Sequence, residues 1–146
     1  MLAHQIGIRS GDRVCLINPP VSFAEKLGTF PDGAELVRPD AEAFDIAVCF
    51  AKTLDLLTER FEVIRQRITP RGSLWLAWPS ASRDTDISFN RVQALGLTAG
   101  MVDNQVAWLD DGWRGLRFVV RTQNREAWPE RTVVHSQYSK DLGSKS

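Results

Sequence analysis

The sequence predicts an α/β protein of three layers, in which a mainly parallel sheet of about six strands lies between helices. Short apolar segments alternate with helical patterns along the 146 residues, which is typical of parallel strands joined by crossover helices. Residues 44–50, FDIAVCF, are apolar almost throughout, as in a strand that is buried on both faces. Near the end, Asp-Gly lies between two apolar segments and indicates a closing antiparallel hairpin.

The first half of the chain contains three predicted strands and one short helix. Residues 13–18, RVCLIN, form the first strand, because they are short, apolar and preceded by a turn sequence. A helix over 22–27 follows, and Ser22 with Glu25 three residues later matches a capping box. Strands at 34–37, stopped by Pro39, and at 44–50 come next.

The second half begins with the clearest helical pattern, over residues 52–68. Its apolar residues recur at steps of three and four, as on one face of a helix: Leu54, Leu57, Phe61, Ile64 and Ile68. Pro70 and Gly72 are predicted to end this helix, before a buried strand over 73–78 that Pro79 closes. A helix over 87–95 follows, with Asp84 or Asp86 as its cap, and then the hairpin strands 101–109 and 114–121.

The length and composition are those of one globular domain, predicted to cover 1–123, with a partly disordered C-terminal extension over 124–146. The formal net charge is zero, so the chain lacks the surplus of positive charge that neutralises phosphates, and nucleic acid is an unlikely partner. No apolar run approaches the roughly 20 residues that cross a membrane, and the start lacks a signal-peptide pattern. These features predict a cytoplasmic location.

Cysteine and histidine offer little for catalysis or metal binding. Cys15 and Cys49 lie inside apolar runs and are predicted to be buried and reduced. His4 and His135 lie at opposite ends of the chain. Neither a zinc site nor a Ser–His or Cys–His pair is therefore predicted.

Several segments resemble known families. The layout, with 44–50 as a fourth strand and ITPRGSLWLAW (68–78) leading into a fifth, resembles class I methyltransferases. The segments 6–20, 71–80 and 100–119 more closely resemble a bacterial domain-of-unknown-function family, number 3052, over roughly residues 5–121. The most specific positions are Gly100, Val102, Asp103, Val106, Asp110, Trp113, Gly115, Leu116 and Phe118.

This resemblance implies a bacterial protein with a methyltransferase-like Rossmann fold. It implies almost nothing about the chemistry of the protein, because the family has no established activity. The chain departs from the family pattern at Ser80 and Gln105, where lysine is usual. If those lysines hold an anion in relatives, this chain has lost the contacts and is a divergent member.

The methyl-donor site of the methyltransferases has no counterpart in the sequence. Their Gly-x-Gly loop lets the backbone approach the donor closely, but no two glycines here are separated by one residue. The loop after the first strand contains Pro19 and Pro20 instead, and Arg38 stands where an acid would hold the ribose, with Asp40 slightly beyond. No cofactor is therefore predicted.

Asn18-Pro19-Pro20 resembles the motif with which amino-methyltransferases hold a base, but the resemblance is incomplete. Val21 stands in place of the aromatic residue, and the motif follows the first strand. A permuted chain order would need a downstream Gly-x-Gly, which is absent. We interpret these prolines as a stiff turn between strand and helix.

The carboxyl ends of the strands remain the expected position of a ligand in an open α/β sheet. The residues predicted there are Asn18, Pro19, Pro20 and Phe23 after the first strand, Ala51 and Lys52 after 44–50, and Trp78, Pro79 and Ser80 after 73–78. Phe23 and Trp78 either form a flat apolar slot or fill the space that a cofactor would occupy. The bulk of these side chains favours the filled alternative.

Two residues outside this crevice are candidates for other roles. Asp103 lies in an otherwise apolar strand, and a carboxylate there needs partners, so we expect a structural link to Arg114 or Arg117 ahead of a functional role. Trp113 follows a turn glycine and is expected to pack back onto the sheet, with an interface role as the alternative.

Three functions are compatible with the sequence. The first is a non-catalytic binding or interaction module that holds a protein partner or a small ligand. The second is an enzyme, possibly a methyltransferase, with an unrecognised site at the strand ends. An open pocket that contains a carboxylate with a raised pKa would favour it. The third is a homo-oligomer that uses Trp113 and the last strand as its interface.

Overall fold

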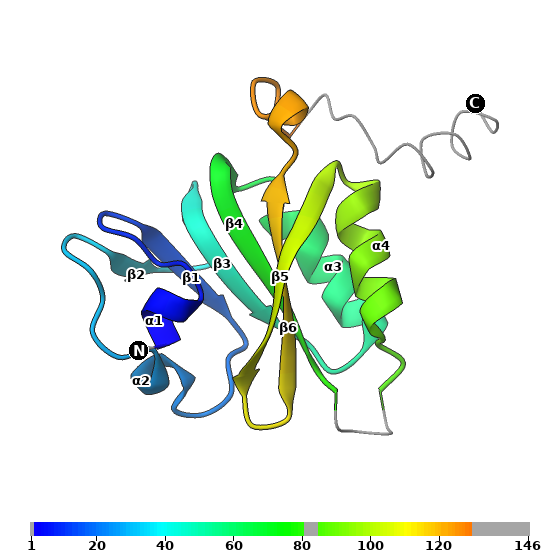
Figure 1. Ribbon diagram of the computed structural model, residues 1–146, viewed down its shortest axis with the longest axis horizontal. Coiled ribbons are helices and arrows are strands. Elements are labelled where there is room, and N and C mark those ends of the chain that lie inside the picture. The colour runs from blue at the N-terminus through cyan, green and yellow to red at the C-terminus, as the bar shows by residue number, and fades with distance from the viewer. Residues whose placement is uncertain (1, 81–84, 130–146) are drawn as a thin grey trace.

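A single six-stranded sheet organises the computed structural model, which describes residues 2–80 and 85–129 (Figure 1). The strands occur in the order β2-β1-β3-β4-β6-β5 across the sheet. Their bounds are β1 (Arg13–Ile17), β2 (Glu35–Val37), β3 (Phe44–Phe50), β4 (Ile68–Pro79), β5 (Met101–Asp110) and β6 (Trp113–Val120). The predicted α/β class is confirmed, and the predicted elements occur in the predicted order, with two short helices, α1 and η1, that were not predicted.

Strand direction divides the sheet into two parts. β1 pairs in parallel with β2 and β3, and β3 pairs in parallel with β4, so the carboxyl ends of these strands lie at one edge. β6 runs antiparallel to both β4 and β5. The predicted hairpin is therefore present, and β6 lies inside the sheet while β5 forms its edge.

Helices cover both faces of the sheet. They are α1 (Leu2–Gln5), α2 (Phe23–Leu27), α3 (Leu54–Ile64), α4 (Phe89–Thr98) and the 3₁₀ turn η1 (Thr122–Asn124). In Figure 1, α3 packs on β3 and β4 and α4 on β5 and β6, whereas α1 and α2 lie together near β1. No helix in the part of the chain that the structure describes is long and apolar enough to span a membrane.

The core consists of two apolar clusters, one on each face, because successive strand residues point to opposite sides. On the α3/α4 face, Cys15, Cys49 and Trp78 pack with the buried stripe of α3. On the other face, Trp75 packs with residues of α1 and α2, and its indole N–H donates to the carbonyl of Ile6 at 2.9 Å. That bond fixes the N-terminal segment on the sheet.

The helix predicted over 52–68 is shorter at both ends. It begins at Leu54 and ends at Ile64, and β4 already starts at Ile68. Pro70 and Gly72, expected to end the helix, lie within β4 instead. The pairing of β3 with β4 is irregular between Phe44 and Ile46, and such an irregularity accommodates a proline that cannot donate to its neighbour.

The predicted helix caps are wrong in both cases. Ser22 has a left-handed backbone, with φ 68°, and its side chain makes no capping hydrogen bond. The helix predicted over 87–95 is Phe89–Thr98, and Ser88 caps it by accepting from the amide of Arg91 at 3.3 Å. Asp86 accepts instead from the Leu54 amide at 2.7 Å, at the start of α3, whose own N-cap is Thr53. Asp84 lies outside the described residues.

The segment after β6 returns to the body of the domain. Asn124 is buried, and its side-chain amide donates to the carbonyl of Gly100 at 2.9 Å. Trp128 is also buried, and its indole N–H donates to the carbonyl of Ile68 at 3.2 Å. The extension predicted to be partly disordered covers 124–146, and its residues 130–146 lie outside the part that the structure describes.

A close approach between α4 and β6 explains one glycine. A Cβ added at Gly96 would lie closer than 3.0 Å to three ring atoms of Phe118, whose side chain is fully buried. We expect Gly96→Ala to destabilise the fold by about 1–3 kcal/mol through overpacking, despite the better helix propensity of alanine. Urea unfolding measures this, with exposed Thr98→Ala as a control of near-zero effect. A gain in stability would contradict the packing shown.

An ion pair joins the start of β1 to the start of β3. The guanidinium Nε of Arg13 lies 3.1 Å from a carboxylate oxygen of Asp45, and the Arg13 amide donates to the same oxygen at 2.8 Å. Burial alone would raise the pKa of Asp45, but hydrogen bonds and charge from Arg13, with a hydrogen bond from Thr69, outweigh it and hold that pKa below its usual value.

The lowered pKa of Asp45 makes stability depend on acid. Because the folded pKa lies below that of the unfolded chain, the stabilisation is present above about pH 4 and is lost as pH falls through the folded pKa. We expect Asp45→Asn to lower the melting temperature at pH 7 and to weaken the further decline between about pH 5 and pH 2. Exposed Asp40→Asn should leave the profile unchanged. Parallel acid profiles for wild type and Asp45→Asn would contradict this role.

Candidate functional site

An open cavity of about 790 Å³ lies at the carboxyl ends of β1, β3 and β4. Its wall comes from the loops that follow these strands, together with α3, the start of β6 and the segment before α4. The described residues that line it are Asn18, Pro19, Pro20, Val21, Phe50, Ala51, Lys52, Leu56, Arg60, Pro79, Thr85 and Trp113. The predicted position of a ligand site therefore coincides with a real hollow in the surface.

The loop after β1 has an unusual backbone for a sequence without glycine. Asn18 and Ser22 both adopt positive φ, 51° and 68°, on either side of the two prolines. Asparagine tolerates this region better than most residues, whereas serine does so less often. The loop therefore turns through two left-handed residues, and its prolines present ring carbons to the cavity.

Arg60 of α3 ties the ends of β1 and β3 together. One guanidinium nitrogen donates to the carbonyl of Phe50 at 2.8 Å. The side-chain amide of Asn18 lies 2.6–3.0 Å from the guanidinium nitrogens, and it accepts from them when its oxygen faces Arg60. Arg60 is thus held in place at the floor of the cavity by two strand ends.

Lys52 supplies a second positive charge. It is exposed and is the second residue after β3, and its carbonyl accepts from the hydroxyl of Thr85 at 2.8 Å. The described part of the cavity wall contains both Arg60 and Lys52 and no carboxylate. The arrangement can therefore hold an anion by charge, with amide and hydroxyl groups beside it.

Aromatic rings form the apolar side of the cavity. Phe50 and Trp113 meet edge to face with ring centroids 5.2 Å apart, and Phe23 meets Phe50 in the same manner at 4.8 Å. Trp113 is half-buried by these contacts. It packs back onto the sheet as predicted, and it also contributes to the cavity wall.

Three of the predicted ligand residues lie elsewhere. Phe23 and Trp78 are buried in separate core clusters on opposite faces of the sheet, so they do not form a slot together. Ser80 is exposed, and its amide donates to the carbonyl of Gly112. Asn18, Pro19 and Pro20 do line the cavity. Arg60 was not predicted from the sequence as a site residue, because no local sequence pattern shows that a polar side chain on a helix extends to the ends of the strands.

The residues at the end of β2 point to solvent. Arg38 and Asp40 form a weak ion pair of 3.4 Å between side chains that are 86% and 76% exposed. Neither belongs to the described wall of the cavity. The place of a ribose-holding acid is therefore taken by an exposed arginine and its own partner.

These features permit a comparison with known proteins. Neither a protein-family model nor a curated protein sequence matches the chain. Solved structures do match. A methyltransferase from Pyrococcus furiosus superposes with a TM-score of 0.55 at 11% identity, over 80% of this chain and 79% of that one.

This chain has a methyltransferase-like fold. A SAM-dependent methyltransferase from Aquifex aeolicus matches with a TM-score of 0.51 at 13% identity, over 80% of this chain and 87% of that one. TrmN from Thermus thermophilus matches with a TM-score of 0.55 at 12% identity, over 82% of this chain and 47% of TrmN. Identities this low establish the fold alone.

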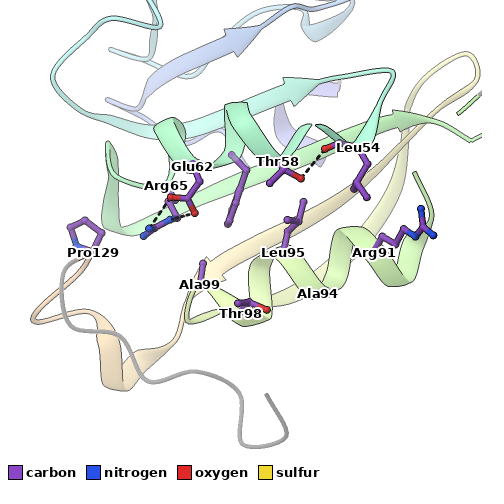
Figure 2. A pocket seen from close by; sticks show the side chains of 11 residues that line it. Leu54, Thr58, Glu62, Arg65, Arg91, Ala94, Leu95, Thr98, Ala99 and Pro129 are labelled. Atoms are coloured by element: carbon purple, nitrogen blue, oxygen red, sulfur yellow. Dashed lines mark hydrogen bonds and ion pairs between the residues drawn. The ribbon is translucent and has the colours of Figure 1, made fainter. Parts of the chain in front are cut away.

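A second groove of this chain lies between α3 and α4, with a volume of about 530 Å³ (Figure 2). Figure 2 shows Glu62 and Arg65 paired at one end, with two contacts of 3.0 Å, and Arg91 at the other. Arg91 donates to the carbonyl of Asp86. This groove is separate from the strand ends, and its charged residues are already engaged with groups of the chain itself.

The two cysteines are inert. Both are buried free thiols, as predicted. Burial raises the pKa of Cys15 to about 11 and that of Cys49 to about 12. Because the thiolate is the reactive form, neither residue is a nucleophile at neutral pH.

Asp103 has a different partner from the one predicted. Each of its carboxylate oxygens lies 3.3 Å from the side-chain amide nitrogen of Gln93 on α4. No ion pair joins it to the described Arg114 or Arg117, and Arg117 donates instead to the side chain of Asn104 at 3.4 Å. Asp103 therefore links α4 to β5, far from the cavity wall.

We expect Asp103→Ala and Gln93→Ala each to cost about 0.5–1.5 kcal/mol, because each removes one half-buried polar contact. The melting temperature should fall by a few degrees for either change. A double-mutant cycle isolates the contact, and the double variant should cost less than the sum of the singles. An unchanged melting temperature for Asp103→Ala would reject the structural link.

Proposed function

We propose that this chain is a non-catalytic binding domain of methyltransferase-like fold, which holds a small organic anion in the cavity at the strand ends. The observation that supports this most is the combination of Arg60 and Lys52 in a described wall that contains no carboxylate. Opposite charges attract strongly where the surroundings are partly apolar, and Phe50, Val21 and Trp113 provide such surroundings.

The same wall suits the methyl donor poorly. S-adenosylmethionine carries a sulfonium and an ammonium group against one carboxylate, so its net charge is positive, like that of the wall. The prolines after β1 also place ring carbons, and no amide donors, where a close backbone approach would be needed. Both points favour a ligand other than the donor and a role other than methyl transfer.

We also infer that the chain is a divergent member of the bacterial family 3052. Support comes from the positions quoted for it, of which Gly115 now has a physical reason. A Cβ there would lie closer than 3.0 Å to two side-chain atoms of Leu109. An uncommon residue requirement of this kind is what a shared fold would preserve.

The proposed function is tested by calorimetric and NMR titrations of the whole chain. We expect no heat from S-adenosylmethionine or S-adenosylhomocysteine at millimolar concentration, and we expect inorganic phosphate to shift the amide signals of Asn18, Ala51 and Lys52. Removing one exposed charge from a phosphate contact should weaken binding about three- to tenfold, so Lys52→Ala should do so.

Arg71→Ala is the matched control, because it removes an exposed positive charge from the opposite end of β4. It should leave phosphate binding unchanged. Micromolar binding of S-adenosylmethionine would replace the proposal with a methyltransferase that has an unusual donor site. An absence of anion-dependent shifts at the cavity would reject anion binding there.

A further inference from the structure

A smaller chamber adjoins the strand-end cavity, on the other side of Arg60. It has a volume of about 190 Å³ and lies under the C-terminal half of α3, from the end of β1 to the start of β3, with Pro39 after β2 at its side. Its lining residues are Ile17, Pro39, Phe44, Glu59, Arg60, Val63 and Ile64. Arg60 is shared by both walls, so it forms a partition between two hollows.

The chamber has the size and character of a site for one ring. Phe44 and Ile64 are buried, and Ile17 and Val63 complete an apolar lining. An apolar cavity of about 150 Å³ in another protein stays dry and binds benzene. The chamber, with a volume of about 190 Å³ and an open rim at the exposed Glu59 and Val63, therefore has room for a six-membered ring.

The charges around the partition give such a ligand a direction. Glu59 lies in the wall of the small chamber, where its carboxylate disfavours an anionic group. Lys52 lies in the wall of the large cavity and attracts one. A ligand with an acidic group is thus oriented with that group in the large cavity and its apolar part in the small chamber.

Arg60 suits both parts of such a ligand. Its guanidinium is fixed by the carbonyl of Phe50 and the side chain of Asn18, so little side-chain freedom is lost when a ligand binds. A planar guanidinium stacks on aromatic rings and also donates to carboxylate or phosphate oxygens. One fixed residue can therefore contact the ring with its face and the acid with its edge.

We propose that the ligand is a small aromatic acid, with its ring in the chamber between Ile17 and Val63, beside Arg60, and its acidic group on Arg60 and Lys52. This inference rests on the proposed anion-binding function and adds the ligand class. The shared chemistry is a flat apolar ring that bears one carboxylate or phosphate. No bond is made or broken in the binding.

Matched pairs of probes test the ring separately from the acid. Phenyl phosphate is compared with inorganic phosphate, and 3-phenylpropionate with propionate, on the whole chain by NMR and calorimetry. Burial of a ring is worth at least about 1.4 kcal/mol, so each aryl probe should bind about tenfold or more tightly than its partner. Only the aryl probes should shift the signals of Val63 and Ile64.

A filled chamber provides the variant. Val63 is 53% exposed and lines the chamber, so Val63→Trp fills it from the rim without disturbing the core. It should abolish the advantage of the aryl probes and leave inorganic phosphate binding unchanged. Val106→Trp, at an exposed position on β5, is the matched control and should keep that advantage.

The outcomes separate this inference from the proposed function. If phosphate binds through Lys52 but phenyl phosphate binds no tighter, the anion site stands and the aromatic class is wrong. If the aryl advantage survives Val63→Trp, or the ring shifts Val21 and Trp113 instead of Val63, the chamber assignment is wrong. If neither phosphate nor either aryl probe binds, both proposals fail.

Discussion

The hydrogen bonds of Arg60 join the strand ends that border the cavity. This side chain extends from α3 to the carbonyl of Phe50, which ends β3, and to Asn18, which follows β1. A parallel pair of strands places those two ends side by side but does not determine the course of the chain beyond them. Arg60 supplies that missing constraint, because it engages Asn18 at the point where the backbone turns left-handed.

The loop after β1 shows how one fold can form a different site. A glycine loop lets the chain approach a ligand through its amide groups. Here two prolines lie between two left-handed residues, so the chain turns in a comparable space but offers carbon atoms in place of donors. The charged groups of the described cavity wall come instead from side chains of neighbouring elements, Lys52 and Arg60.

The elements that could be predicted from the sequence are those set by burial alone. The apolar run at 44–50 and the stripe Leu57–Phe61–Ile64 each determine their own face, so β3 and the core side of α3 are correct. The predicted helix caps were wrong although both side chains are of suitable types. The backbone of Ser22 is left-handed, and Asp86 accepts a hydrogen bond from the amide of Leu54 instead. The contacts of Asp103 and Arg60 depend on register between distant elements, which no local pattern contains.

The buried thiols described above also affect how this protein can be studied. Because burial raises both pKa values well above neutral, each thiol stays protonated near neutral pH. Both thiols lie in the core and out of reach of reagents. A single cysteine introduced on the surface would therefore be modified selectively, so a spectroscopic label can be attached beside the cavity without removing either native residue.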